Sequence, residues 1–118
     1  MSRIASGLAL ASALVAVSLC VPGVASARDC GSFDKKISSD TTYTIEVSTS
    51  RVTCRSGTRL MKDFWFRRGR VQHGGPYTYN TYFTLKRWPG WRCYTGAGAG
   101  QCNKRGGRRV RYTIPPAE

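Results

Sequence analysis

The amino-acid sequence predicts a small α+β domain in which one helix packs on an antiparallel sheet of about four strands. Residues 54–69 have the apolar spacing of an amphipathic helix. Short segments before and after them are rich in alternating, β-branched or aromatic residues, as half-buried strands are. We place one strand before the helix and three after it, an order that favours a helix laid across an antiparallel sheet.

The first 27 residues have the organisation of a secretory signal peptide. Arg3 precedes an apolar run from Leu8 to Val21, and Ala25-Ser26-Ala27 matches a small-x-small cleavage site. An uncleaved membrane anchor is disfavoured because the apolar run is short for a span. We therefore expect cleavage after Ala27 and secretion of residues 28–118 as a single extracellular domain.

The mature chain contains an even number of cysteines, namely Cys30, Cys54, Cys93 and Cys102. In a secreted chain this predicts two disulfides, which a domain this small needs because its core is thin. We expect Cys54 to pair with Cys93 or Cys102, because that bond would tie the helix to the sheet. The local pairs Cys30–Cys54 and Cys93–Cys102 are the alternative. The spacing contains no Cys-x-x-Cys pair, so we expect neither zinc nor another metal or cofactor.

The predicted helix begins after Thr53, whose hydroxyl can accept an unpaired backbone N–H. It ends before Gly69, which suits the left-handed position beyond a helix terminus. Asp63 can meet Arg59 and Arg67 at four-residue spacing. The face expected to be buried is formed by Gly57, Leu60, Met61 and Phe64.

The strands are expected at residues 42–47, 77–88 and 91–94 and in a final hairpin that turns at residues 105–107. Alternation places Val110, Tyr112 and Ile114 on one face of that hairpin and Arg109, Arg111 and Thr113 on the other. Polar or glycine-rich composition predicts loops at residues 34–41 and 69–76, a turn at Pro89-Gly90 and a flexible segment at residues 96–100. We expect the three tryptophans to fill the core.

Positive charge dominates the composition. The chain has 19 Lys and Arg against 6 Asp and Glu, and loss of Arg3 with the leader leaves a formal net charge of +12. Such an excess attracts nucleic acid, anionic membrane surfaces or anionic envelope polymers, although arginine can also be a general surface residue. Arginines recur beside aromatic residues at 64–68, 86–88 and 91–92. The candidate anion-binding residues are Arg67, Arg68, Lys104, Arg105, Arg108, Arg109 and Arg111.

Residues suited to catalysis are few. His73 is the single histidine, and it lies in a glycine-rich segment. A small ribonuclease could use Glu46 as base and His73 as acid, but a surface ion pair and a solvated histidine account for the same residues. No nucleophile motif and no phosphate-cradling glycine loop is present. We therefore expect no enzymatic activity.

Four short motifs stand out along the chain. These motifs are Cys54 at the head of a short helix, Gly90-Trp91-Arg92-Cys93, Cys102-Asn103-Lys104-Arg105-Gly106 and Val110-Arg111-Tyr112. In these motifs the chain resembles a group of small secreted actinobacterial proteins over most of its mature part, which implies secretion, disulfides and the same fold class but no activity. It departs from the group in a longer aromatic insertion before Gly90 and in having Gly57 where alanine is expected.

Three functions from different classes follow. The first is a secreted cationic protein that binds an anionic envelope polymer, nucleic acid or anionic lipid. The second is a secreted effector, either an inhibitor of an extracellular enzyme or an antimicrobial. The third is the small ribonuclease. The sequence leaves open a protein partner and the oligomeric state.

Overall fold

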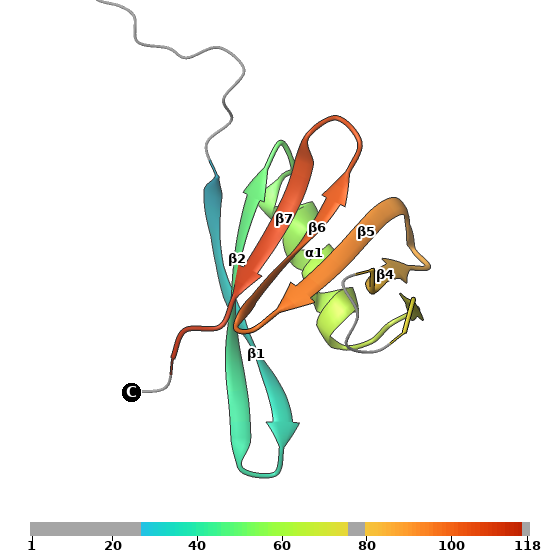
Figure 1. Ribbon diagram of the computed structural model, residues 1–118. Coiled ribbons are helices and arrows are strands. Elements are labelled where there is room, and N and C mark those ends of the chain that lie inside the picture. The colour runs from blue at the N-terminus through green and yellow to red at the C-terminus, as the bar shows by residue number, and fades with distance from the viewer. Residues whose placement is uncertain (1–26, 76–79, 117–118) are drawn as a thin grey trace, which may run out of the picture.

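The computed structural model describes residues 27–75 and 80–116 (Figure 1). They form a single antiparallel sheet of seven strands with one helix against it. The elements in chain order are β1 (Arg28–Ser38), β2 (Thr41–Ser50), α1 (Cys54–Trp65), β3 (Arg70–His73), β4 (Tyr82–Leu85), β5 (Trp88–Gly96), β6 (Ala99–Lys104) and β7 (Arg108–Thr113). The strand order in the sheet is β1-β2-β7-β6-β5-β4-β3.

The prediction of one helix on about four strands is therefore wrong, because the domain is mostly sheet. Residues 34–41, predicted as a loop, form the end of β1 and the turn into β2. Residues 70–73, also predicted as loop, form the edge strand β3. Both strands lie at sheet edges, where side chains meet solvent on both faces and apolar alternation is weak.

Two predicted turns also lie elsewhere. The chain turns at Lys86 and Arg87, whereas Pro89-Gly90 lies inside β5. The pairing of β4 with β5 is irregular there, and Gly90 has φ of 86°. An irregularity of this kind accommodates a proline that has no N–H for the ladder. Residues 96–100, predicted to be flexible, make the tight turn in which Gly96 pairs with Ala99.

Helix α1 confirms the predicted start and buried face, but it ends at Trp65, three residues before the predicted end. Thr53 is the N-cap, and its Oγ1 accepts a hydrogen bond from the Ser56 backbone N–H at 3.1 Å. Helical geometry ends at Phe66, Arg67 follows with φ of 58°, and Gly69 has φ of 69°. All four apolar-face residues are buried: Gly57, Leu60, Met61 and Phe64.

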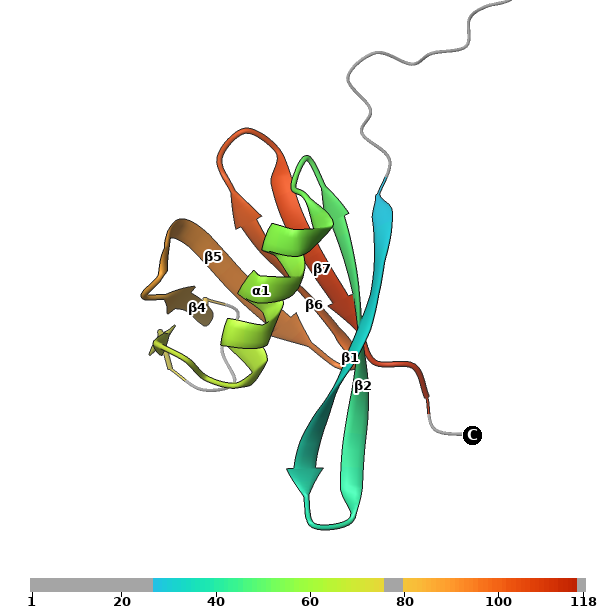
Figure 2. The same ribbon diagram turned by 180° about the vertical axis from the view of Figure 1, so that it is seen from behind.

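The helix covers one face of the sheet and leaves the other face without a helix, as Figures 1 and 2 show from opposite sides. The core lies between α1 and the inward side chains of β2, β4, β5, β6 and β7. Trp91 belongs to this core, and Trp65 and Trp88 pack against it partly buried. In the final hairpin Val110 and Tyr112 are buried while the arginines between them are exposed, as alternation predicts.

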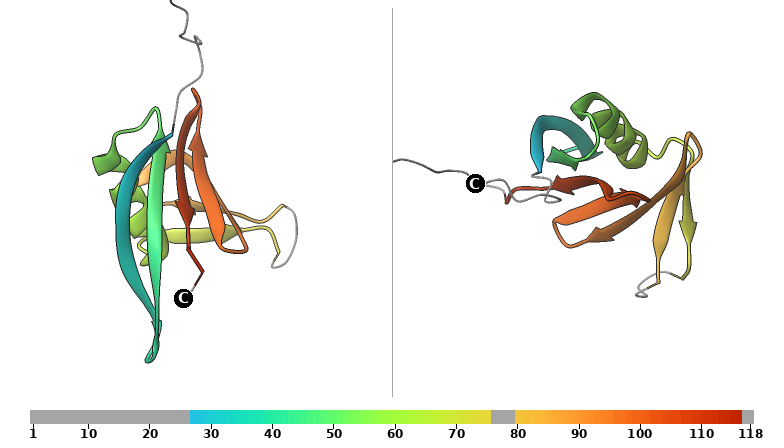
Figure 3. Two further views of the ribbon diagram at one scale, coloured as in Figure 1. Left: turned by 90° about the vertical axis from the view of Figure 1, so that its left-hand side faces the viewer. Right: turned by 90° about the horizontal axis from the view of Figure 1, so that it is seen from above.

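The outer part of the β1–β2 hairpin extends beyond the remaining sheet, because β7 pairs only with residues 46–50 of β2. Figure 3 shows this extension and the curl of the sheet around the helix. No helix among the described residues has the length and apolar character needed to cross a membrane.

Both disulfides form, but not with the pairing that we expected. Cys30 of β1 is bonded to Cys54 at the start of α1, and Cys93 of β5 is bonded to Cys102 of β6. Cys93 and Cys102 are direct register partners on adjacent strands, with Cα atoms 3.9 Å apart, so the pairing of β5 with β6 places each within reach of the other. The helix is consequently tied to the edge strand rather than to the centre of the sheet. Two disulfides indicate an oxidising environment.

Candidate anion-binding groove

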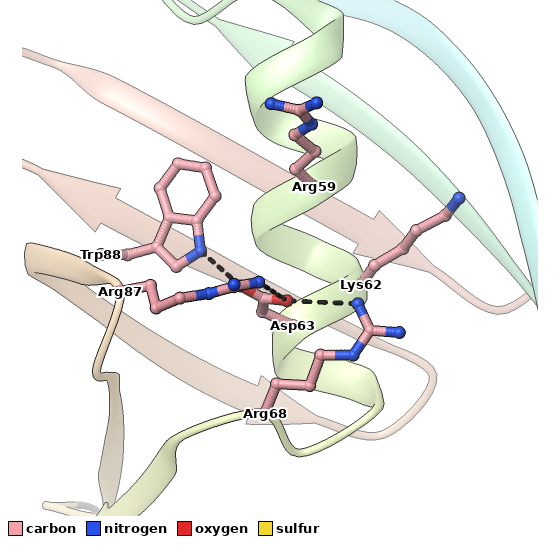
Figure 4. Close-up of a pocket in the computed structure, with 6 residues that line it drawn as sticks. All are labelled: Arg59, Lys62, Asp63, Arg68, Arg87 and Trp88. Carbon is pink, nitrogen blue, oxygen red and sulfur yellow. Dashed lines mark hydrogen bonds and ion pairs between the residues drawn. The ribbon is translucent and has the colours of Figure 1, made fainter.

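A buried carboxylate on α1 organises the surface between the helix and the β4–β5 turn. Asp63 is 3% exposed, and its Oδ2 accepts a hydrogen bond of 2.9 Å from Trp88 Nε1. Arg87 Nη2 donates to both carboxylate oxygens at 3.2 Å, and Arg68 Nη1 donates to Oδ1 at 3.4 Å. Figure 4 shows these side chains converging on Asp63 from the helix end and from the turn.

The predicted partners of Asp63, Arg59 and Arg67, make no ion pair with it. The four-residue rule describes neighbours on the solvent side of a helix, whereas Asp63 points towards the β4–β5 turn. Its partners therefore come from beyond the helix end and from a segment 24 residues away.

Backbone contacts hold the helix end and the β4–β5 turn together. The Arg68 N–H donates to the Asp63 carbonyl at 2.8 Å, and the Lys86 N–H donates to the Gly69 carbonyl at 2.9 Å. A Cβ at Gly69 would lie 2.8 Å from Lys86 Cβ, so this close approach requires glycine. The two arginines that contact Asp63 are thus presented from a fixed backbone.

The pKa of Asp63 lies below its ordinary value. Burial alone would raise the pKa, but the hydrogen bonds from Trp88 and Arg87, the charge of Arg87 and the hydrogen bond from Arg68 outweigh that effect. Asp63 is therefore ionised at neutral pH with its oxygens already bonded to protein donors.

Around Asp63 lies a hollow of about 470 Å³, lined by Arg59, Lys62, Asp63, Arg68, Arg87 and Trp88. It contains four cations and one carboxylate. Arg68 and Arg87 face that carboxylate, whereas Arg59 has no hydrogen bond or ion pair with any described residue. Lys62 Nζ lies 5.8 Å from the centroid of the Phe33 ring. Positive charge therefore exceeds negative charge in this hollow.

A second hollow of about 450 Å³ adjoins the first, since Arg87 and Trp88 line both. It extends past the helix N-terminus to the β6–β7 hairpin, where Arg51, Lys104 and Arg108 enter it. A Cβ at Gly90 would lie 3.3 Å from Lys104 Cε, so the glycine lets this lysine cross β5. We call the combined surface the cationic groove, and define it by Arg51, Arg59, Lys62, Arg68, Arg87, Lys104 and Arg108.

The candidate residues from the sequence do not form one cluster. Lys104 and Arg108 share strand parity with the inward Cys102 and Val110, so they lie on the helix side and line the groove with Arg68. Arg109 and Arg111 lie on the helix-free face. Arg105 is in the β6–β7 turn and Arg67 follows the helix, and both are exposed outside the groove.

Four groove residues were missed by the sequence analysis: Arg51, Arg59, Lys62 and Arg87. The spacing of Arg59 and Lys62 along α1 was a usable signal, because residues three apart share a helix surface. The run at residues 86–88 is recognisable from its basic and aromatic composition, but its position opposite α1 depends on strand order. Nothing in the local sequence indicated Arg51.

The two residues considered for ribonuclease chemistry lie far apart. Glu46 is on β2, where it accepts a hydrogen bond from Thr113 Oγ1. His73 is on β3, where Nε2 lies 2.8 Å from Thr84 Oγ1 and the ring stacks on Tyr82. Four strands separate β2 from β3, which is roughly 24 Å along the sheet at about 4.8 Å per strand. Glu46 and His73 therefore do not share a reaction centre.

No protein-family model, curated protein or solved structure matches this chain. Within residues 27–75 and 80–116, no three His, Cys, Asp or Glu side chains gather as metal ligands would. The cationic groove is therefore identified as a candidate site by its geometry and charge alone.

Proposed function

We propose that this protein is a secreted, non-enzymatic cationic protein that binds a phosphate-bearing envelope polymer along the cationic groove. One observation carries the proposal: two adjoining hollows contain seven cations and a single carboxylate, and protein donors already satisfy that carboxylate. A phosphate chain would replace the missing negative charge and accept hydrogen bonds from the guanidinium groups.

The groove favours a phosphate polymer over nucleic acid and over lipid. Single-stranded nucleic acid stacks on successive exposed rings, but Trp91 is buried and Trp88 is partly buried against the core. Membrane binding needs exposed apolar side chains beside the charges. The exposed large apolar residues lie outside the groove: Ile37, Tyr43, Phe66, Val71 and Tyr94.

Secretion is part of the proposal. Arg3, the apolar run from Leu8 to Val21 and the Ala25-Ser26-Ala27 site support removal of residues 1–27. The disulfides fit an oxidising exterior. Expression of the full chain in a secreting bacterial host should release a protein whose N-terminal residue is Arg28. Its measured mass should match residues 28–118 with two disulfides. Retention of an intact leader at the membrane would contradict this part of the proposal.

The binding test uses the oxidised 28–118 protein and synthetic poly(glycerol phosphate). The groove variant is Arg59→Gln/Arg108→Gln, with one exposed residue from each hollow. The matched control is Lys36→Gln/Arg109→Gln, which removes the same charge from exposed positions outside the groove. Calorimetry at about 150 mM salt should show that the affinity for poly(glycerol phosphate) falls at least tenfold in the groove variant and less than threefold in the control.

The salt dependence provides a second readout. Removal of two phosphate contacts should reduce the slope of log K against log salt by about 1.4, because each contact releases counterions. An equal loss of affinity in the two variants would mean that net charge, not the groove, attracts the polymer. Tighter binding of single-stranded RNA or phosphatidylglycerol vesicles than of poly(glycerol phosphate) would reject the envelope polymer as partner.

A further inference from the structure

A separate hollow lies on the helix-free face, which Figure 1 presents to the viewer. Its volume is about 470 Å³, and it spans β2, β7, β6 and β5. The side chains that strand parity directs onto this face at the hollow are Ser48, Tyr94, Gln101, Arg111 and Thr113. Gly96 and Gly100 also line it and add no side chain. The composition differs from that of the cationic groove, because a single cation is surrounded by the exposed Tyr94 ring, the buried Tyr112 and neutral polar groups.

Arg111 is tethered to the neighbouring strand by one hydrogen bond, and part of its guanidinium is free. Its Nε donates to Gln101 Oε1 on the adjacent strand at 3.2 Å. Neither Nη atom bonds to any described residue, so two parallel N–H donors remain for a ligand. This planar fork matches the two oxygens of a carboxylate, and the Gln101 hydrogen bond reduces the freedom that Arg111 would lose on binding.

Tyr94 supplies the one accessible ring at this hollow. It is 38% exposed, and its centroid lies 6.3 Å from that of Tyr82. Tyr82 is itself occupied, because His73 stacks on it at 4.8 Å and the Arg92 guanidinium lies 4.6 Å from its centroid. The face therefore lacks the succession of free rings on which a single nucleic-acid strand stacks.

The neighbouring charges limit the ligand further. Glu46 is the register partner of Thr113 and accepts a hydrogen bond from its Oγ1, so a carboxylate borders the hollow. A dense polyphosphate would be repelled there. A sugar chain that carries one carboxylate on each ring, with one of them aligned with Arg111, would face less of this repulsion.

We propose that this hollow binds a carboxylated sugar residue. The Arg111 fork holds the carboxylate, the Tyr94 ring packs against the apolar face of the sugar, and Ser48, Gln101 and Thr113 bond to its hydroxyls. Concave sites with one aromatic wall and a few convergent polar groups are typical of small-ligand recognition. The site lies on the opposite face from the cationic groove and is independent of the function proposed there.

The test is a ¹H–¹⁵N NMR titration of the oxidised 28–118 protein with trigalacturonate. Shifts should concentrate on Tyr94, Gln101 and Arg111, including the Arg111 Nε–H, and neutral galactotriose should bind at least tenfold more weakly. Arg111→Gln should lower the affinity for trigalacturonate at least tenfold, and Tyr94→Ala at least threefold.

Arg109→Gln is the matched control. Arg109 lies on the same strand and face, and its Nε is held by Asn103 Oδ1 at 3.2 Å as Arg111 is held by Gln101, but it does not line the hollow. Its affinity for trigalacturonate should stay within twofold of the wild type. The groove variant should likewise retain binding, which separates failure of this site from failure of the groove.

Three outcomes would overturn the proposal. Equal losses in Arg111→Gln and Arg109→Gln would reduce the effect to general charge attraction. Shifts centred on the groove would place the sugar at the other surface. Displacement of trigalacturonate by an oligo(dT) strand that binds tighter at the same residues would assign the hollow to nucleic acid.

Discussion

At the residue scale, Gly57 sets how closely the helix approaches the sheet. A Cβ at this position would lie 2.3 Å from Thr49 Cγ2, a distance that real Cβ atoms do not show. Gly57→Ala should therefore destabilise the domain, by about 1–3 kcal/mol from overpacking, less up to about 1 kcal/mol gained in helix propensity. Urea unfolding of the 28–118 protein measures the difference.

The control for this prediction is a second variant. Thr49→Ser removes the Cγ2 methyl while keeping the hydroxyl, whose Oγ1 lies 3.5 Å from Cys30 Sγ. The loss of unfolding free energy caused by Gly57→Ala should be at least halved when it is measured in a Thr49→Ser background. A Gly57→Ala variant as stable as the wild type would show that the helix moves to accommodate the methyl group without cost.

Asp63 makes stability depend on acid pH. Its pKa is lowered in the folded state, so the unfolded chain binds the proton first as the pH falls. The stabilisation is complete above the unfolded value of about 3.9 and is lost as the pH falls through the lower folded pKa. Asp63→Asn should cost about 2 kcal/mol at pH 7, and the difference from the wild type should shrink towards pH 2. A difference that stays constant from pH 7 to pH 2 in urea titrations would argue against this origin.

Local rules predicted the residues whose environment is local. The Thr53 cap and the buried face of α1 follow from spacing within the helix, and the structure confirms both. The predicted partners of Asp63 were wrong, because Arg87 is brought to it by the tertiary fold and not by helical spacing. The partners of a buried carboxylate can therefore lie outside any short sequence window around it.

At the element scale, the strands that the sequence missed are the ones that bury least. β1 and β3 are edge strands with mostly exposed residues, so hydrophobic alternation gives little signal for either. Pairing with a neighbouring strand defines them instead: β1 pairs with β2 along residues 28–38, and β3 pairs with β4 along residues 70–73. The central strands β2 and β7 bury alternate residues and were recognisable from sequence.

The Cys30–Cys54 disulfide should have a local effect on the edge strand. It closes a loop with a sequence separation of 24, for which the chain-entropy relation gives about 3.5 kcal/mol. β1 is the outermost strand on this side and pairs with β2 alone. Cys30→Ala/Cys54→Ala should therefore raise hydrogen exchange in β1 at least tenfold more than in β5 and β6.

Cys93→Ala/Cys102→Ala provides the comparison, because both sulfurs are buried at the centre of the sheet. Loss of that disulfide should lower protection across the whole domain rather than in one strand. Mass-spectrometric exchange measures both variants at matched temperature and pH. Uniform deprotection from β1 to β7 in Cys30→Ala/Cys54→Ala would show that β1 does not open independently.

At the scale of the whole molecule, composition predicted the amount of charge but not its division. Lys104 and Arg108 face the groove while Arg109 and Arg111 face the opposite side, because side chains alternate along paired strands. Which of these residues meets α1 depends on β7 lying between β2 and β6. The sequence shows the alternation, but strand order and helix placement decide which cations become neighbours.

The net charge of +12 on residues 28–118 should make stability rise with salt. Screening weakens the repulsion between cations, and Arg68 and Arg87 are the cations that form ion pairs within the described residues. Sodium chloride should therefore raise the melting temperature between about 10 and 300 mM. Chloride acts only by screening in this account, so it provides the baseline for an anion that occupies the groove.

Sodium tripolyphosphate at the same ionic strength should raise the melting temperature further. A ligand at 100 times its dissociation constant adds about 2.7 kcal/mol to the stability of the state that binds it, which corresponds to roughly 10 °C or more for a domain of this size. The Arg59→Gln/Arg108→Gln variant should lose most of this additional rise, whereas Lys36→Gln/Arg109→Gln should retain it. Equal melting temperatures in chloride and tripolyphosphate at matched ionic strength would mean that the seven cations of the groove act as dispersed surface charge and form no anion site.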